Sequence, residues 1–333
     1  MFNGKQVLIT GGTGSIGSEL VRQIITQSPK VIRVYSRDES KHFQLQQEFA
    51  DHENIRYLVG DIRDKDRLVY AAKDIDYIFH AAALKHVPAC EFNPFEAVKT
   101  NVLGTQNIIE AAIANEVEKV VSISTDKVVN PINTMGATKL LSEKIISAAE
   151  FYKGSSRTKF CCVRFGNVMG SRGSVIPLFI QQLKKKLPIT LTHKEMTRFM
   201  MTIEEAAGLV IKAASMASGG ETFVLKMPVI RINDLAEVLL EDYLDSGSSE
   251  SHPGIIKVGM RPGEKLHEEL MTLEESERAY ENDRMFMIVP GRNSKKSLPQ
   301  EFSKAAKKPY ASNGAEPLDK SQLKELLKNT RFI

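Results

Sequence analysis

A glycine-rich segment directly after the first apolar run sets narrow limits on the fold of this chain. The run at residues 6–10 is short and rich in β-branched residues, and it leads into Gly11-Gly12-Thr13-Gly14-Ser15-Ile16-Gly17 and then into a helical apolar pattern. Glycines in such a strand–turn–helix unit permit a tight turn, a close approach of backbone to a pyrophosphate, and close packing of helix on sheet. The segment therefore predicts a dinucleotide site, with an ordinary glycine turn as the alternative.

Short β-branched runs alternate with amphipathic segments through the first half of the chain. The runs lie at residues 6–10, 31–35, 55–59, 77–80, 119–124 and 159–165, and the helical patterns lie at 18–27, 39–50, 101–114 and 137–152. This alternation is typical of a parallel sheet with crossover helices. We expect an α/β fold with a Rossmann-like, doubly wound parallel sheet in residues 1–165. A smaller, interleaved C-terminal substrate domain is expected mainly in 166–293, followed by a tail at 294–333.

Charge and cysteine content limit the classes of partner. Lys plus Arg number 45 and Asp plus Glu 41, and this net charge of +4 is too mild to demand nucleic acid. The three cysteines lack paired metal-ligand spacing and no HxxH, CxxC or HExxH pattern occurs, so we expect no metal. Without a signal region or a run of about 18 apolar residues, we expect a reduced, cytoplasmic location and no membrane contact.

Residues at the ends of the next strands are candidates for binding the rest of the dinucleotide. An arginine after the second strand accepts a ribose 2′-phosphate, whereas an acid there selects the free hydroxyl. The segment Ser36-Arg37-Asp38 holds both, so Arg37 favours NADP while Asp38 leaves NAD open. The other candidates are Asp61, for the adenine, its neighbour Ile62, and the small residues Ala81, Ala82 and Ala83, which let backbone approach the cofactor. A plain strand-end turn is the alternative for these.

A hydroxyl, an acid and two amines gather after the fifth run. Thr125, Asp126 and Lys127 follow the strand directly, and Met135 and Lys139 lie four residues apart on the next helical pattern. At that spacing Met135 and Lys139 share one face of the helix, and Thr125 at the end of the strand could meet that face. A lone helical lysine is usually solvated, but its neighbours here indicate an active site. A tyrosine would be expected where Met135 stands, and a thioether cannot act as a base.

These segments resemble the extended short-chain dehydrogenase/reductase family, with Met135 in place of the tyrosine of Tyr-x-x-x-Lys. Closer still, the chain is similar to soluble UDP-N-acetylglucosamine 4,6-dehydratases that invert C5, one branch of which, associated with capsule synthesis, carries this methionine. The stretches that carry the likeness are Tyr35–Glu39, Gln46–Phe49, Gly60–Asp64, Ala81–Pro88, Asn101, Ser124–Lys127, Asn130–Pro131, Lys139, Arg172–Pro177 and Arg261–Glu268.

The resemblance implies a cycle in which NADP oxidises C4 of the sugar, water is eliminated across C5 and C6, and hydride returns to C6. Asp126 is implied as the acid for the C6 oxygen and Lys127 as the base for H5. An Asp-Lys pair indicates inversion, because retaining enzymes commonly carry Asp-Glu. Lys139 is expected to bind the nicotinamide ribose, and it or a water near Thr125 would relay the proton of the 4-hydroxyl. Asn101 is expected at the cofactor.

UDP-N-acetylglucosamine is the implied substrate, and arginines suit its diphosphate. The resemblance places Lys85 and His86 near the sugar, Asn167 and Arg172 near the diphosphate, and Arg198, Arg261 and Glu264 near phosphate or the uridine ribose. Each of these residues alone could equally be structural. The family also implies a homo-oligomer, often a hexamer, and the amphipathic stretch at 318–327 suggests that the tail latches onto a neighbouring subunit.

Three alternatives stay open beside an inverting dehydratase that begins a bacterial surface-polysaccharide or glycoprotein sugar pathway. A C5-retaining UDP-sugar 4,6-dehydratase would differ only in product stereochemistry. An NAD(P)-dependent UDP-sugar epimerase would share the fold but needs no Asp-Lys pair and should keep the tyrosine. A non-catalytic NADP-binding protein would explain the missing tyrosine, but not why Thr125, Asp126, Lys127 and Lys139 are all present.

Overall fold

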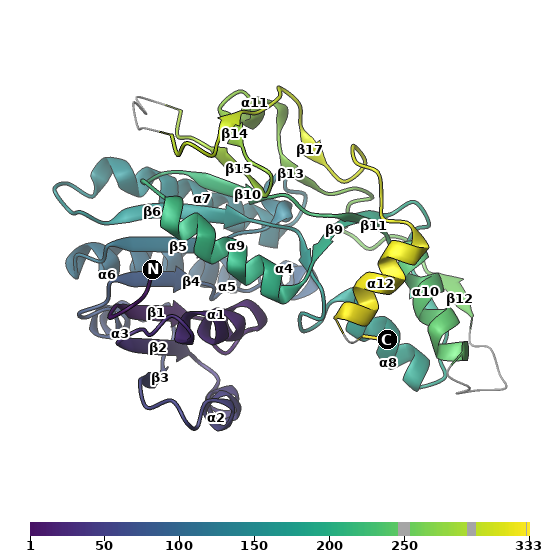
Figure 1. Cartoon of the computed structure of the whole chain (residues 1–333), viewed down its shortest axis with the longest axis horizontal. Coiled ribbons are helices and arrows are strands. Elements are labelled where there is room, and N and C mark those ends of the chain that lie inside the picture. Colours follow the sequence, from purple (N-terminus) through teal and green to yellow (C-terminus); the bar gives the residue numbers. More distant parts are fainter. Residues whose placement is uncertain (246–253, 292–297, 331) are drawn as a thin grey trace.

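The alternating runs of the first half build most of a ten-stranded sheet (Figure 1). Its strands, in spatial order, are β16 (Ser303–Lys304), β14 (Ala279–Glu281), β15 (Met285–Ile288), β10 (Thr222–Leu225), β6 (Lys159–Arg164), β5 (Lys119–Ile123), β4 (Tyr77–His80), β1 (Gln6–Thr10), β2 (Val31–Ser36) and β3 (Ile55–Val59). The strands from β3 to β10 run parallel, and β15, β14 and β16 extend that edge in antiparallel fashion. This computed structural model describes residues 1–245, 254–291, 298–330 and 332–333.

Both faces of the sheet are covered because its strands are apolar on both sides. In β1, Val7 and Ile9 belong to one core, and Leu8, which points to the opposite face, belongs to another. The helices α1 (Ser15–Ile25), α2 (Glu39–Glu48) and α9 (Ile203–Met216) bury apolar residues in the first core, and α3 (Lys65–Ala71), α6 (Gly104–Ala114) and α7 (Thr134–Tyr152) in the second. The predicted doubly wound α/β fold is confirmed.

The predicted elements of the first half agree with the structure except around the fourth crossover. Residues Val98–Leu103 form a π-helix, η1, and α6 begins only at Gly104, so the predicted helix start at Asn101 is wrong. Before η1 lie two short helices that no apolar periodicity indicated, α4 (Val87–Phe92) and α5 (Pro94–Ala97). Each carries a proline in its first turn, where the missing N–H costs nothing.

A third apolar core lies beyond the carboxyl ends of the strands. It is built by α8 (Val175–Lys184), β8 (Ile189–Leu191), β9 (Thr197–Met201), α10 (Ile232–Asp245) and α12 (Lys320–Asn329). Figure 1 shows α8, α10, α12 and β12 (Ile255–Lys257) together at one end of the molecule, away from β3. Small sheets complete this region: β7 (Asn167–Val168) and β11 (Val229–Arg231) flank β9, while β13 (Glu269–Met271) pairs with β17 (Tyr310–Ala311).

The second half of the chain contributes to both parts of the molecule. β10, β14, β15 and β16 join the large sheet although they follow residue 165, so the two parts are interleaved in sequence. The predicted boundary at 293/294 lies outside the described residues. In the tail, Leu323 and Leu327 of α12 are fully buried in the third core of their own chain. The contact of this tail with a neighbouring subunit stays a prediction. Such a contact would have to use residues of the tail other than Leu323 and Leu327.

Among the described residues, no helix is both long and apolar enough to cross a membrane.

Candidate active site

The glycine-rich turn joins β1 to α1 and is closely packed on one side only. Gly11 has φ +67°, and a Cβ there would lie 2.7 Å from the backbone nitrogen of Ala82; a Cβ at Gly17 would lie 2.2 Å from the Gly11 carbonyl oxygen. At Gly14 a Cβ would meet only that carbonyl, at 3.0 Å, and Gly14 caps α1 without a side chain. The helix N-terminus is thus open at Gly14, where its dipole and N–H groups suit a pyrophosphate.

The residues predicted to select the cofactor's ribose lie at the end of β2, and most are engaged with neighbours. Ser36 Oγ is 2.9 Å from Thr13 Oγ1, which ties this strand end to the glycine turn. Asp38 caps α2 by accepting from the backbone N–H of Lys41 at 3.0 Å. The Arg37 guanidinium is about half exposed and lies 3.6 Å from Asp61 Oδ2. Arg37 therefore has room to meet a phosphate, whereas Asp38 already serves the helix.

Two further predicted cofactor residues have structural contacts. Asn101, in η1, accepts a hydrogen bond at its Oδ1 from the backbone N–H of Leu84 and donates from Nδ2 to the Leu84 carbonyl and to Thr138 Oγ1. It therefore fastens the segment after β4 to α7. Ile62 is buried and packs so closely on the start of α6 that a Cβ at Gly104 would lie 2.7 Å from Ile62 Cδ1.

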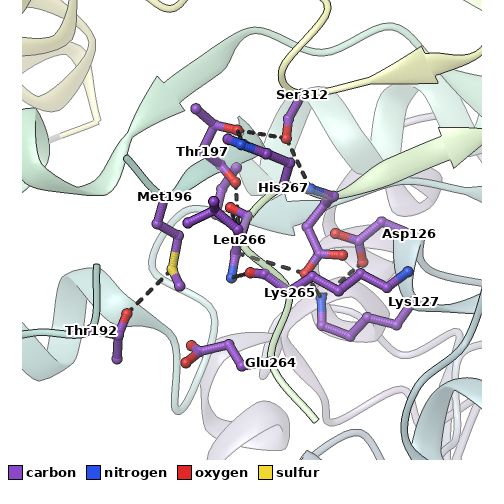
Figure 2. Close-up of polar contacts among 12 residues, drawn as sticks. Asp126, Lys127, Thr192, Met196, Thr197, Glu264, Lys265, Leu266, His267 and Ser312 are labelled. Carbon is purple, nitrogen blue, oxygen red and sulfur yellow. Dashed lines mark hydrogen bonds and ion pairs between the residues drawn. The ribbon is translucent and has the colours of Figure 1, made fainter. Parts of the chain in front are cut away.

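Asp126 and Lys127 form an ion pair at the end of β5, in which the lysine side chain is 27% exposed. They lie on the 3-10 helix η2 (Asp126–Val128), where Asp126 is fully buried. Asp126 Oδ1 accepts a hydrogen bond from Thr125 Oγ1 at 2.7 Å and another from Lys127 Nζ at 2.9 Å, and Figure 2 shows the two charged side chains together. Asp126 Oδ2 has no partner within the described chain. Burial lowers the pKa of Lys127, but the charges of Asp126 and Glu268 outweigh it and hold that pKa above its ordinary value. The lysine is therefore cationic in this state.

The helix α7, which carries Met135 and Lys139, packs against the backbone of this pair at residue 136. Close approach is possible because residue 136 is glycine: a Cβ there would lie 2.2 Å from the Lys127 carbonyl oxygen. Lys139 is almost fully buried and donates to the Ile123 carbonyl at 2.6 Å; burial lowers its pKa. Met135 is 3% exposed and packs with Cys90 and Ala97, so it fills space and offers no proton.

Three of the predicted substrate residues come together over the glycine turn. The Lys85 ammonium donates to the carbonyl of Arg172 at 2.9 Å, and a Cβ at Gly173 would lie 2.6 Å from His86 Cε1. The Arg172 guanidinium donates to the Thr13 carbonyl, and its backbone N–H donates to Ser15 Oγ at 3.3 Å. The loop at 171–173 therefore lies against both the predicted cofactor turn and the segment after β4. The predicted ligand contacts of these residues stay predictions.

The other four predicted substrate residues differ in their surroundings. Asn167, in β7, has a buried Oδ1 with no partner among the described residues, as expected of a group that meets a ligand. Arg198, in β9, is buried and donates to the carbonyls of residues 197, 265 and 266. Glu264 accepts from the backbone N–H of Arg261 at 3.1 Å in a turn. For Arg198 the structure thus shows a packing role, and its predicted phosphate contact stays untested.

Glu268 was given no role from sequence, yet the structure places it beside the ion pair. It is 3% exposed, and its Oε1 lies 3.6 Å from Lys127 Nζ and 3.8 Å from Arg198 Nε. The one signal for it was its place at the end of the Arg261–Glu268 stretch. The cluster of Figure 2 thus combines η2 with residues from β9 and from the segment before β13.

Comparison with known proteins places this chain in a family. A model described as polysaccharide biosynthesis protein matches residues 7–290. An uncharacterized membrane protein of Methanocaldococcus jannaschii is 50% identical over 100% of this chain and 98% of its own. A UDP-N-acetylglucosamine 4,6-dehydratase (inverting) of Campylobacter jejuni is 44% identical over 87% of this chain and 84% of its own. A UDP-glucose 4-epimerase of Rickettsia bellii is 40% identical over 100% and 98%.

Solved structures show the same fold. The X-ray structure of Pen from Bacillus thuringiensis is 49% identical, covers 100% of both chains and superposes with a TM-score of 0.94. A dTDP-glucose 4,6-dehydratase from Streptomyces venezuelae, determined with NAD and TYD bound, is 24% identical, covers 78% of this chain and 86% of its own, and has a TM-score of 0.69. At that identity the second likeness concerns the fold alone.

Proposed function

Since the chain belongs to the polysaccharide biosynthesis protein family, we propose that it is a UDP-N-acetylglucosamine 4,6-dehydratase that inverts C5 and works with bound NADP. The observation that carries this proposal is the Asp126–Lys127 pair, whose carboxylate is buried and keeps one oxygen without a partner in the described chain, next to the helix that presents Lys139. Elimination of water from a sugar needs an acid and a base side by side, and this pair supplies both. The 44% identity to a dehydratase of this kind supports the same reading.

The glycine turn fits a nicotinamide dinucleotide, because Gly14 is open where the pyrophosphate would lie. When bound, this cofactor supplies oxidation at C4 and the later reduction at C6. Arg37 supports NADP, since its exposed guanidinium suits a 2′-phosphate and Asp38 is engaged as a helix cap. A dehydratase of the same fold binds NAD, so NAD is the alternative. Comparing the two dissociation constants of wild type with those of Arg37→Ala separates them.

Lys127 and Asp126 carry the elimination. Once C4 is a ketone, H5 is acidic, and the neutral Lys127 amine takes it while Asp126 gives its proton to the leaving C6 oxygen. Afterwards Lys127 returns a proton to C5 from the face that gives inversion. The buried position of Asp126 supports this role, because water that would compete for its proton is largely excluded.

The 4-hydroxyl needs a base that is not a tyrosine. Thr125 Oγ1 already donates to Asp126 Oδ1 at 2.7 Å, which gives a path for a proton from the sugar hydroxyl through Thr125 to the carboxylate. Lys139 assists, because its lowered pKa makes the amine form more accessible near the nicotinamide ribose. Met135 takes no part in proton transfer.

An epimerase is the second candidate, because the Rickettsia bellii relative covers the whole chain at 40% identity. An epimerase loses no water and has no use for a buried acid–base pair at C5 and C6. Formation of a C6 methyl group therefore separates the two activities, and the configuration at C5 separates an inverting from a retaining dehydratase.

Proton NMR of the purified protein with UDP-N-acetylglucosamine in D2O tests the proposal. We expect a new C6 methyl signal and an inverted, deuterated C5 without added cofactor, because the cofactor ends the cycle as it began. A methyl with retained C5 would establish the retaining dehydratase, and a change at C4 without a methyl would establish the epimerase. If nothing changes even with NADP supplied, the dehydratase reading is wrong.

We also propose a homo-oligomer, which the exposed apolar residues of one region support. Phe92 is 86% exposed and Phe95 is 65% exposed on α4 and α5, and Leu141 and Phe151 of α7 are exposed as well. Large exposed aromatic residues in one region indicate a protein interface. Light scattering of the full chain would test this, and a monomer at micromolar concentration would contradict it.

A further inference from the structure

The C-terminal segment holds the backbone of Glu268, the residue that follows His267, through Ser312. Its backbone N–H donates to Ser312 Oγ at 2.9 Å, and the backbone N–H of Ser312 donates to its carbonyl at 2.8 Å. Ser312 Oγ also lies 2.7 Å from Thr197 Oγ1, next to Arg198 in β9. The backbone of Glu268 is thus tied to Ser312, and through Ser312 to β9, while its carboxyl group makes no hydrogen bond within the described chain.

The Glu268 carboxyl lacks the hydrogen bonds that usually stabilise a buried charge. Its contacts of 3.6 Å with Lys127 and 3.8 Å with Arg198 are too long for hydrogen bonds, and Oε2 has no partner among the described residues. A buried carboxylate without donors is costly, and protonation removes that cost. The charged groups that face it are Asp126, Lys127, Arg198 and Lys265.

The proposed mechanism creates a need for such a group. Lys127 rests as an ammonium paired with Asp126, yet it must be a neutral amine to remove H5. Asp126 Oδ1 already accepts two hydrogen bonds, and these favour its ionised form. The proton that leaves Lys127 therefore needs a second acceptor close to its ammonium group.

We propose that Glu268 accepts this proton and so releases the amine of Lys127; the inference rests on the proposed function. One N–H bond of the ammonium breaks and one O–H bond forms on Glu268, so a positive and a negative charge disappear together. The 3.6 Å separation has to shorten by about 0.8 Å to reach hydrogen-bond distance. Burial and the charge of Asp126 raise the pKa of Glu268, and the cations facing it do not cancel the rise. Glu268 acts through Lys127 and is a positioning residue.

The test is the pH profile of solvent deuterium exchange at C5 in Glu268→Gln, which keeps the size of the side chain but cannot take a proton. We expect a rate loss of about 10- to 100-fold at pH 7, an acid limb moved to higher pH, little change in KM, and partial rescue by Glu268→Asp. If Glu268 merely stabilised the ammonium, its removal would move the acid limb to lower pH. That result, or an unchanged profile, would overturn the proposal.

Glu269→Gln is the matched control, because the Glu269 carboxylate accepts a hydrogen bond from Asn130 at 2.8 Å outside the cluster. The pH profile of this variant should equal that of wild type.

A second readout does not need activity. With a raised pKa, Glu268 stabilises the fold below its unfolded pKa, near 4.3, and this stability is lost as pH rises through the folded pKa. The Tm of Glu268→Gln relative to wild type should then rise by about 2 °C between pH 5 and pH 8. A difference in Tm between Glu268→Gln and wild type that stays constant from pH 5 to pH 8 would contradict the inference, whether or not wild type makes a dehydrated product. The absence of a dehydrated product would refute the proposed function separately.

Discussion

Two buried clusters of charge in this protein differ in how fully their polar atoms are paired. Arg164, in β6, makes five hydrogen bonds: two to Glu143 of α7, two to Glu275 of α11 (Leu273–Ser276) and one to the Leu270 carbonyl. At Lys127, in contrast, Asp126 Oδ2 and Glu268 Oε2 are buried without partners in the described chain. The paired cluster joins the sheet to the C-terminal region, whereas the unpaired one keeps acceptors free for a substrate. A buried charged group whose hydrogen-bonding atoms are all paired indicates a structural role. A buried charged group with unpaired oxygens indicates a binding or catalytic role.

The titration behaviour of the two clusters follows the same division. Burial lowers the pKa of Arg164, but the charges of its two glutamates more than offset this, so it stays cationic at every accessible pH. Glu275 is likewise kept ionised, because Arg164 lowers its pKa more than burial raises it. At the other cluster the pKa of Glu268 is raised and no hydrogen bond fixes its charge. The two clusters thus differ in direction: the pKa of the carboxyl group is lowered at Glu275 and raised at Glu268.

The largest expected effect is the loss of activity in Lys127→Ala. Removing the base should lower H5 exchange and turnover by about 10²- to 10⁴-fold while cofactor binding persists. Deuterium incorporation at C5 and the dissociation constant for NADP are the measurements. Lys119→Ala is the control, because Lys119 only donates to the carbonyls of residues 214 and 215 at the end of α9. Normal turnover in Lys127→Ala would show that another residue removes H5.

The paired cluster should instead govern stability. Arg164→Met leaves two buried carboxylates without their cation, so we expect the free energy of unfolding to fall by about 3–5 kcal/mol. Asp126→Asn should lower it by less, because the Lys127 ammonium that loses its partner is 27% exposed to water and still faces Glu268 at 3.6 Å. Urea unfolding of both variants checks this contrast. Adding Glu143→Gln and Glu275→Gln to Arg164→Met should restore part of the loss; equal destabilisation by Arg164→Met and Asp126→Asn would break the comparison.

Local pattern predicted the first half of the fold and one side of the active site. The runs around β1 to β6, the glycine turn and the Asp126–Lys127 pair all depend on residues near one another in sequence. Glu268 and the partners of Arg164 come from distant segments without clear periodicity, so only the folded chain brings them together. The alanines after β4 led to an expectation of bare backbone near the cofactor, and Ala82 does pack against Gly11. The helices α4 and α5 that follow were missed because they are too short to show an apolar period.

The smallest expected effect is that of Met135→Tyr, which asks whether the missing phenol matters to the unpaired cluster. Met135 is 3% exposed in a small apolar group, so a larger ring should cost about 1–3 kcal/mol of stability, while Met135→Leu should cost less than about 1.5 kcal/mol. Because protons can move among Thr125, Asp126, Lys127 and Glu268 without a phenol, kcat/KM should stay within about tenfold of wild type. Product formation followed by NMR, with urea unfolding in parallel, measures both. An increase in kcat/KM well beyond tenfold in Met135→Tyr would mean that these four residues do not replace the phenol. The methionine would then limit the rate of the wild-type protein.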